Sequence, residues 1–158
     1  MRIVVLSDSH GNAAVVEQII RRHQADAEVF LHLGDGAREF ENAACLYEGR
    51  VFWGLRGNCD WGIDLPSERV LTLEGVRLFF CHGHTLGVKS TLGPLWERAR
   101  AEGCALALYG HTHAAHLERR DGITLMNPGS CSRPREGKPG YGIVDLVNGV
   151  PVCNLVTL

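Results

Sequence analysis

The stretch IVVLSDSHGN, residues 3–12, decides the fold class, because an apolar run passes directly into a polar turn. Ile3 to Leu6 predict a β-strand, and Asn12 can cap a helix from Ala13 to about His23. The next expected elements are a strand over Val29 to Leu33, a helix over Arg38 to Tyr47 and a strand over Val51 to Leu55. This β-α-β-α-β alternation favours a parallel sheet with crossover helices.

The second half of the chain has a different pattern, because its apolar runs come in pairs that short turns separate. The turns are Glu74-Gly75, Asp121-Gly122 and Asn148-Gly149, which are typical of β-hairpins. The paired strands are expected at residues 70–73 with 76–81, 117–120 with 123–126, and 142–147 with 150–156. A helix over Leu92 to Glu102 and a strand over Leu106 to Tyr109 lie between them. These strands are too many for one narrow sheet, so we expect two packed sheets with helices outside.

Length and composition are typical of one globular domain. The chain has 158 residues, of which 45% are hydrophobic and 22% charged, and we expect a single domain over residues 1–158. The net charge of −2 argues against an extensive nucleic-acid footprint. No apolar run approaches the roughly 18 residues that a membrane span needs. The six cysteines form no C-x-x-C pair and no signal peptide is evident, so we expect reduced thiols and a cytoplasmic location.

Small groups of metal-capable side chains follow five of the apolar strands. They contain Asp8 with His10, Asp35, Asn58, His82 with His84, and His111 with His113. Ligands of open α/β sheets bind beyond the carboxyl ends of the strands, so we expect these side chains to converge. Residues two apart in an extended backbone point the same way, which suits the Asp8–His10 and His111–His113 pairs. Each residue alone would be read as a turn, cap or surface residue, whereas the set predicts a metal site.

The ordered set resembles the calcineurin-like metallophosphoesterase superfamily. Gly57-Asn58-Cys59-Asp60 and Asn127-Pro128-Gly129-Ser130 are similar to motifs of its small YfcE-type phosphodiesterase branch. The resemblance runs from Met1 to about Val156. It implies an α/β fold, namely a four-layer α/β/β/α sandwich of two mixed β-sheets flanked by helices, with a two-metal site at one edge.

The resemblance also implies how the ligands are shared between two ions. One ion would take Asp8, His10, Asp35 and His113, and the other Asp35, Asn58, His82 and His111. His82 is preferred to His84 by its match to the family pattern, since spacing does not distinguish them. The mixed nitrogen and oxygen donors suit Mn²⁺, Fe, Co²⁺, Ni²⁺ or Zn²⁺ better than Mg²⁺ or Ca²⁺, and we expect Mn²⁺ first.

The implied reaction is hydrolysis of a small phosphodiester by a water or hydroxide that bridges the two ions. Many superfamily members have a histidine where this chain has Cys59, and that histidine is the expected acid for the leaving group. We therefore expect His84 to be the catalytic acid. Asn12 follows the Asp8–His10 motif and Arg56 precedes Gly57-Asn58, so we expect these two side chains to contact the phosphate. The alternatives are that His84 holds His82 or a metal-bound water, and that Asn12 or Arg56 caps a helix or pairs with Asp60.

Three other functions use a similar scaffold. A phosphomonoesterase would use the same ligands and would profit from the cations of the Asn127–Gly140 segment, Arg133, Arg135 and Lys138. A metal-binding interaction scaffold that resembles a retromer subunit would not need competent side chains at all seven ligand positions. A nuclease of the recombination-repair type would need DNA-contacting segments for which the chain has no room. The exposed edges of two sheets would also allow a homodimer.

Overall fold

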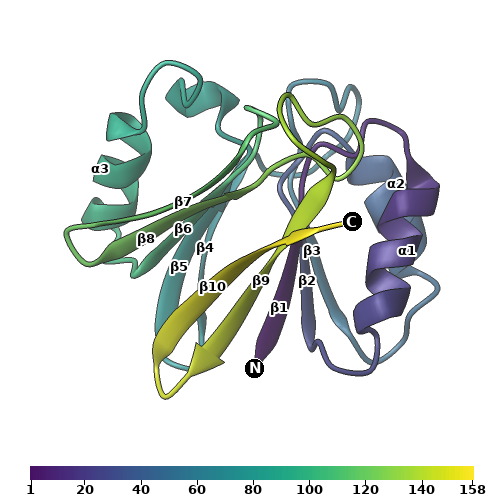
Figure 1. Cartoon of the computed structure of the whole chain (residues 1–158), viewed down its shortest axis with the longest axis horizontal. Helices are drawn as coiled ribbons and strands as arrows, with labels where there is room; N and C mark the ends of the chain where they lie inside the picture. The colour runs from purple at the N-terminus through teal and green to yellow at the C-terminus, as the bar shows by residue number, and fades with distance from the viewer.

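Two mixed β-sheets face each other and carry helices on their outer faces (Figure 1). The computed structural model describes residues 1–158. The elements of the first half are β1 (Arg2–Leu6), α1 (Ala13–His23), β2 (Val29–His32), α2 (Ala37–Ala44), β3 (Val51–Gly54), β4 (Glu68–Leu73) and β5 (Val76–Cys81). Those of the second half are η1 (His84–Leu86), α3 (Gly93–Ala101), β6 (Leu106–Tyr109), β7 (Ala115–Arg120), β8 (Ile123–Pro128), β9 (Gly140–Val147) and β10 (Val150–Thr157).

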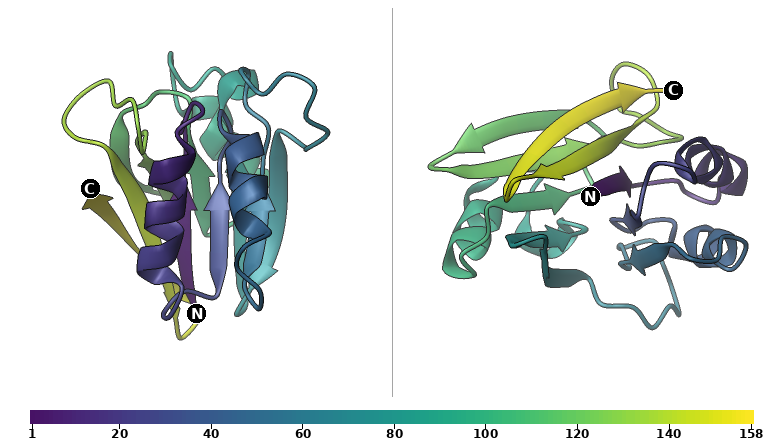
Figure 2. Two further views of the ribbon diagram at one scale, coloured as in Figure 1. Left: turned by 90° about the vertical axis from the view of Figure 1, so that its right-hand side faces the viewer. Right: turned by 90° about the horizontal axis from the view of Figure 1, so that it is seen from below.

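The first sheet has the strand order β10-β9-β1-β2-β3, and the second has the order β4-β5-β6-β8-β7. Strands β1, β2 and β3 are parallel, which confirms the prediction from the alternating pattern. Helices α1 and α2 lie side by side over the outer face of this sheet, and α3 covers the outer face of the other (Figures 1 and 2). The predicted α/β/β/α sandwich is therefore confirmed.

The three predicted hairpins are present, and their turns have the backbone that type I′ geometry requires. Glu74, Asp121 and Asn148 have φ values of 48°, 47° and 50°, and the glycine after each also has a positive φ. The pairing of β5, β6 and β8, however, is parallel. The hairpin pattern did not predict these parallel pairings, because it shows which strands are joined by turns and not which strands become neighbours. In the fold, β7 lies at the sheet edge and β8 lies between β6 and β7.

Three apolar layers separate the four layers of secondary structure. Ile3 and Val5 of β1 face the second sheet, whereas Val4 and Leu6 face the two helices. All four side chains are fully buried. A strand that is covered on both faces has a continuous apolar sequence, which explains why β1 shows no polar alternation. Leu95 and Ala99 of α3 close the third layer against β5 and β6.

Helix α2 ends earlier than predicted, at Ala44 instead of Tyr47. The amides of Leu46 and Tyr47 bond to carbonyls three residues back, so the last turn tightens and the α-helix stops.

All six cysteines are free thiols. No helix has the length and hydrophobicity to cross a membrane.

Candidate metal centre

The carboxyl ends of β1, β2, β3, β5 and β6 meet at one edge of the sandwich, which lies at the top of Figure 1. The loops that leave these ends carry all seven predicted ligands: Asp8, His10, Asp35, Asn58, His82, His111 and His113. The structure brings the seven side chains together in two adjoining groups of donor atoms.

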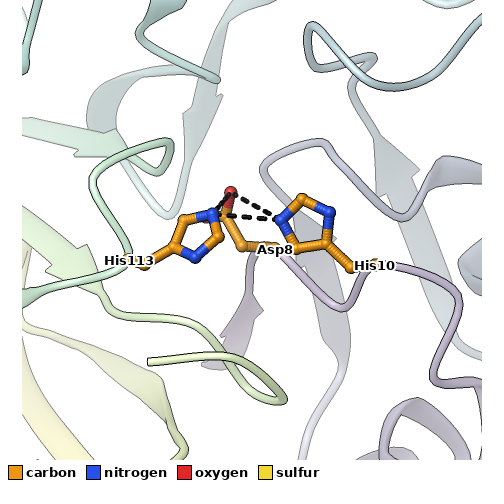
Figure 3. A group of neighbouring side chains, drawn as sticks. All are labelled: Asp8, His10 and His113. Atoms are coloured by element: carbon orange, nitrogen blue, oxygen red, sulfur yellow. Dashed lines mark hydrogen bonds and ion pairs between the residues drawn. The ribbon is translucent and has the colours of Figure 1, made fainter. Parts of the chain in front are cut away.

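The first group contains Asp8, His10 and His113 (Figure 3). The Nε2 atoms of the two histidines lie 3.0 Å apart. Oδ1 of Asp8 lies 3.2 Å from Nε2 of His113 and 3.9 Å from Nε2 of His10. This oxygen is buried and has no hydrogen-bond donor. An unpartnered carboxylate oxygen that faces two imidazole nitrogens fits a bound cation.

The second group contains Asp35, His82 and His111, with Asn58 beside them. Oδ2 of Asp35 lies 3.6 Å from Nε2 of His82, and Oδ1 of Asn58 lies 3.1 Å from the same nitrogen. The rings of His82 and His111 are 5.0 Å apart between centroids. Oδ2 of Asp35 is also 3.9 Å from Nε2 of His10, so this carboxylate lies between the two groups.

Hydrogen bonds fix the tautomers of two histidines. Nδ1 of His82 lies 2.8 Å from the carbonyl oxygen of Leu33, and Nδ1 of His113 lies 2.8 Å from that of Arg133. Because a carbonyl only accepts, each Nδ1 carries a hydrogen and donates it to that carbonyl, which leaves each Nε2 facing the site as the atom that could bind a cation. A metal-bound histidine usually makes this contact through its other nitrogen.

The charge states also suit metal binding. Burial, followed by the neighbouring His82 and Lys89, lowers the pKa of His111 to about 4, so its imidazole is neutral at pH 7. Burial acts to raise the pKa of Asp8, but His113, His82 and Ser7 outweigh it and lower that pKa below its ordinary value. The site therefore offers an ionised carboxylate beside a neutral ring.

Five of the seven residues adopt the left-handed backbone conformation, which non-glycine residues rarely adopt. Their φ values are 54° for Asp8, 45° for His10, 54° for Asp35, 68° for His111 and 59° for His113. The expectation that extended backbone aligns the paired ligands is therefore wrong, because sharp turns aim them instead. Such strain at a cluster of polar groups is typical of functional sites.

Two glycines leave room for the carboxylates. A Cβ atom on Gly57 would lie 2.1 Å from Oδ1 of Asp35, and one on Gly110 would lie 2.1 Å from Oγ of Ser7. The same Cβ atom on Gly110 would lie 3.0 Å from Oδ2 of Asp8. Any side chain at these positions would displace a ligand or its support.

Asp60 supports the site in a way that the sequence analysis missed. Its carboxylate accepts hydrogen bonds from four backbone amides, those of Asp35, Gly36, Ala37 and Gly57. It thereby caps α2, whose N-cap residue Gly36 has no side chain to do so. It is not paired with Arg56. The sequence signal for this role is that Gly36, at the start of α2, has no side chain to accept hydrogen bonds from the first amides of the helix, so a distant residue must do so.

The motif Asn127-Pro128-Gly129-Ser130 ties the loops of the two sheets together. The buried Ser130 hydroxyl donates to the backbone carbonyl of Asp8 at 2.7 Å. The Asn127 amide group donates to the carbonyl of Gly110 at 3.0 Å. Ser7 and the amide of His111 both donate to Oδ2 of Asp8. These groups hold Asp8 in place, and sequence reasoning did not identify Ser7.

The predicted non-ligand residues lie around the centre in different settings. The His84 ring is 5.2 Å from that of His82, and its buried Nδ1 has no partner. Burial, followed by His82 and by the Arg56 guanidinium, lowers the pKa of His84. Arg56 is exposed. Asn12 accepts a hydrogen bond from the amide of Val15 at 3.2 Å, which is the helix-cap alternative.

Cys59 is a further candidate that spacing alone did not identify as part of a metal-binding group. Its sulfur lies within reach of His10 and Asp35. Desolvation of the sulfur and the Asp35 carboxylate raise the pKa of Cys59 to about 11. The thiol is therefore protonated at neutral pH and is a weaker ligand than the oxygen and nitrogen donors around it.

Sequence comparison agrees with this geometry. Residues 1–149 match the family model for the calcineurin-like phosphoesterase superfamily domain. YsnB of Bacillus subtilis, named a probable metallophosphoesterase, is 33% identical over 94% of this chain and 86% of its own length. Phosphodiesterase YfcE of Escherichia coli is 32% identical over 92% of this chain and 88% of its own length.

Solved structures show the same fold. A predicted phosphoesterase from Streptococcus pneumoniae has a TM-score of 0.81 and 27% identity, and the match covers 97% of this chain and 96% of that one. Zinc-complexed Vps29 of Entamoeba histolytica has a TM-score of 0.77 with coverage of 98% and 97%. Its identity of 19% indicates a shared fold alone.

The sandwich and the Asp, Asn and His cluster at its strand ends define a metallophosphoesterase domain. The chain belongs to the calcineurin-like phosphoesterase superfamily. It is a metal-dependent phosphoric ester hydrolase.

Proposed function

We propose that the protein hydrolyses small phosphodiesters at a centre of two divalent transition-metal ions. The position of the Asp35 carboxylate carries this proposal. Its Oδ2 atom lies 3.9 Å from Nε2 of His10, in the first donor group, and 3.6 Å from Nε2 of His82, in the second. A carboxylate within reach of both groups is suited to bridge two ions.

Bound divalent ions would supply an acidic water as the nucleophile and would stabilise negative charge on the phosphoryl oxygens. Asp8 and Asp35 contribute only two negative charges against the four positive charges of two such ions. The imidazole and amide donors are neutral, so the site stays attractive for an anionic ester. Mn²⁺ is our first expectation, and Fe, Co²⁺, Ni²⁺ and Zn²⁺ suit the same donors.

His84 is our candidate for protonating the leaving group. Its ring lies beside His82, with centroids 5.2 Å apart, and the residue is only partly buried. The protonated thiol of Cys59 is a poor alternative, because its pKa of about 11 gives it little tendency to release a proton. An anionic substrate beside His84 would raise the pKa of this imidazole and favour the acid form.

Arg56 and Asn12 are the proposed phosphate contacts, with unequal support. Arg56 is exposed, is close enough to His84 to lower its pKa, and is not paired with Asp60. Its guanidinium can therefore turn toward a bound phosphoryl group. The Asn12 side chain is engaged in capping α1, so only the Arg56 contact is strengthened by the structure.

A phosphomonoesterase is the second candidate for this site. A monoester dianion favours additional cations, and the loop before β9 was the expected source. Arg133 lines the pocket beside His10, whereas Arg135 and Lys138 do not. A single cation from this loop suits the one negative charge of a phosphodiester better than the two negative charges of a phosphomonoester. The scaffold alternative has less support, since all seven ligand positions carry competent side chains. The cytoplasmic location and the homodimer stay predictions from the sequence.

The test is hydrolysis of bis-p-nitrophenyl phosphate and p-nitrophenyl phosphate, measured side by side. Chelator-treated protein would be reloaded separately with Mn²⁺, Ni²⁺, Co²⁺, Zn²⁺ and Mg²⁺. We expect metal-dependent cleavage of the diester that Asn58→Ala abolishes and that Asn154→Ala, an exposed asparagine on β10, leaves unchanged. Absence of diester cleavage with every metal, in protein that binds two ions, would contradict the proposal.

A further inference from the structure

A pocket of about 330 Å³ opens directly beside the metal centre. Its lining includes the proposed ligands His10 and Asp35 together with Cys59. Trp61 lines the same pocket. The volume is at the lower end of the range of roughly 300–1,000 Å³ that is usual for small-molecule sites. Whatever group is attached to a phosphate at the centre can therefore extend into this pocket.

Trp61 is the most exposed of the large hydrophobic side chains, at 84%. The other two tryptophans have protein partners. Arg100 and Arg120 lie over the Trp96 ring, and Trp53 packs against the core between the sheets. Burying this exposed indole against a ligand would recover the hydrophobic free energy of the ring.

The backbone that carries Trp61 is fixed with respect to the metal centre. The amide of Trp61 donates to the carbonyl of Cys59 at 3.1 Å. The preceding residue, Asp60, is held by four backbone amides from the two loops that supply Asp35 and Asn58. The Cα atom of Trp61 is therefore held beside the metal centre, whereas its ring is exposed and can turn toward a ligand in the pocket.

Two arginines supply positive charge to the same pocket. Arg38 and Arg133 both line it, both are exposed, and neither has a carboxylate within ion-pair distance. The Glu39 carboxylate of the pocket is already engaged, since Oε1 accepts from Ser9 and from the amide of Gly11 at 2.7 Å each. The guanidinium groups are thus available to an anionic or hydrogen-bonding ligand.

We propose that Trp61 determines substrate specificity by stacking on the planar base of a nucleoside ester group, an inference that rests on the proposed phosphodiesterase function. Arg38 and Arg133 would contact polar edges of that group or a phosphate oxygen. Only three of the eleven lining residues are hydrophobic, which disfavours a lipid chain in this pocket. An aromatic platform flanked by cations beside a phosphate site suits a nucleotide.

The binding test compares adenosine 5′-monophosphate with ribose 5-phosphate, which lacks the base. Isothermal titration of Mn²⁺-loaded protein should show tighter binding of the nucleotide. Trp61→Ala should weaken nucleotide binding about five- to tenfold, at the low end for base stacking, and leave ribose 5-phosphate unchanged. Trp61→Phe should retain most of the affinity. Leu46→Ala removes another exposed apolar side chain, 68% exposed, and should change neither ligand.

The activity test uses two diesters with the same leaving group, thymidine 5′-monophosphate p-nitrophenyl ester and methyl p-nitrophenyl phosphate. Trp61→Ala should raise KM about five- to tenfold for the nucleoside ester only, with kcat nearly constant. Equal effects on both esters, or none on either, would overturn the role of Trp61 while leaving the phosphodiesterase intact. If the wild type cleaves neither ester, the proposed function fails, and the titrations alone then decide whether Trp61 recognises the base.

Discussion

Nε2 of His10 lies 3.0 Å from Nε2 of His113, although the two residues follow strands of different sheets. Nδ1 of His113 donates to the carbonyl of Arg133, which leaves its Nε2 facing the site. The unpartnered Oδ1 atom of Asp8 faces the same space. Three donor atoms from distant segments therefore converge on one point, and a cation there would hold the two sheets together at this edge.

Metal binding should consequently stabilise the folded protein. An ion at about 100 times its dissociation constant adds about 2.7 kcal/mol to the free energy of unfolding. Calorimetry should show a higher Tm with Mn²⁺ than after chelator treatment, and Asp8→Asn should remove most of that difference. A wild-type Tm that does not respond to any of the divalent metals would contradict this account.

Substitution of Gly110 should damage the site through packing. An added methyl group at this position would meet Oγ of Ser7 at 2.1 Å and Oδ2 of Asp8 at 3.0 Å. We expect Gly110→Ala to cost about 1–3 kcal/mol of stability and to weaken metal binding. Gly93→Ala is the matched control, because a Cβ there meets only Thr91 Oγ1 at 3.5 Å at the start of α3. Equal effects of the two substitutions on unfolding and on metal titration would argue against this explanation.

Removal of the Asp60 carboxylate should loosen the loops that carry Asp35 and Asn58. Four backbone amides lose their acceptor in Asp60→Ala, so we expect a loss of about 2–3 kcal/mol in unfolding free energy. Urea denaturation measures this loss. Asp64→Ala, which removes an exposed carboxylate from the same loop, should have almost no effect. Similar midpoints for the two variants would show that Asp60 does not anchor the loops.

Acid should weaken the contact between β1 and β9 through Asp145. Its side chain accepts two hydrogen bonds from the Arg2 guanidinium, which lowers the pKa of Asp145. Because the pKa of Asp145 is lower in the folded protein than in the unfolded chain, its ionised form stabilises the fold. This contribution to the unfolding free energy is complete above the unfolded-state pKa of about 3.9 and is lost as the pH falls through the folded-state pKa. Asp145→Asn should therefore cost about 1 kcal/mol at pH 7 and progressively less below pH 4. Unfolding measured from pH 7 to pH 3 checks this, and a cost that does not change with pH would exclude the mechanism.

The sequence was informative wherever local pattern determines structure. Continuous apolar runs with intervening helical periodicity predicted β1, β2 and β3, and the metal-capable residues after the strand ends do lie together in the fold. Local pattern could not show that β8 pairs with β6 in parallel, because that pairing depends on β7 occupying the edge. The strands of the second sheet have similar apolar sequences, so their order is determined by tertiary packing and not by the local sequence of each strand.

The site shows the same division between local and tertiary information. Residue type and position suggested Asp8 and His113 as ligands, but the local pattern did not show the left-handed backbone conformation that both residues adopt. The hydrogen bond from Ser130 to the Asp8 carbonyl and the role of Asp60 as a helix cap join residues far apart in the chain. Spacing could not choose between His82 and His84, and only the fold shows that His82 donates to the Leu33 carbonyl, a contact that suits a metal ligand.

The most direct test of the central claim is the number of metal ions bound per chain, measured together with diester hydrolysis. Mass-spectrometric metal analysis of reloaded protein should give two ions in the wild type, one in His113→Ala, and fewer than one in Asp35→Asn, whose carboxylate faces both groups. Hydrolysis of bis-p-nitrophenyl phosphate should fall with the loss of either ion. Full activity in a protein that holds one ion, or two retained ions in Asp35→Asn, would contradict a dinuclear centre bridged by Asp35.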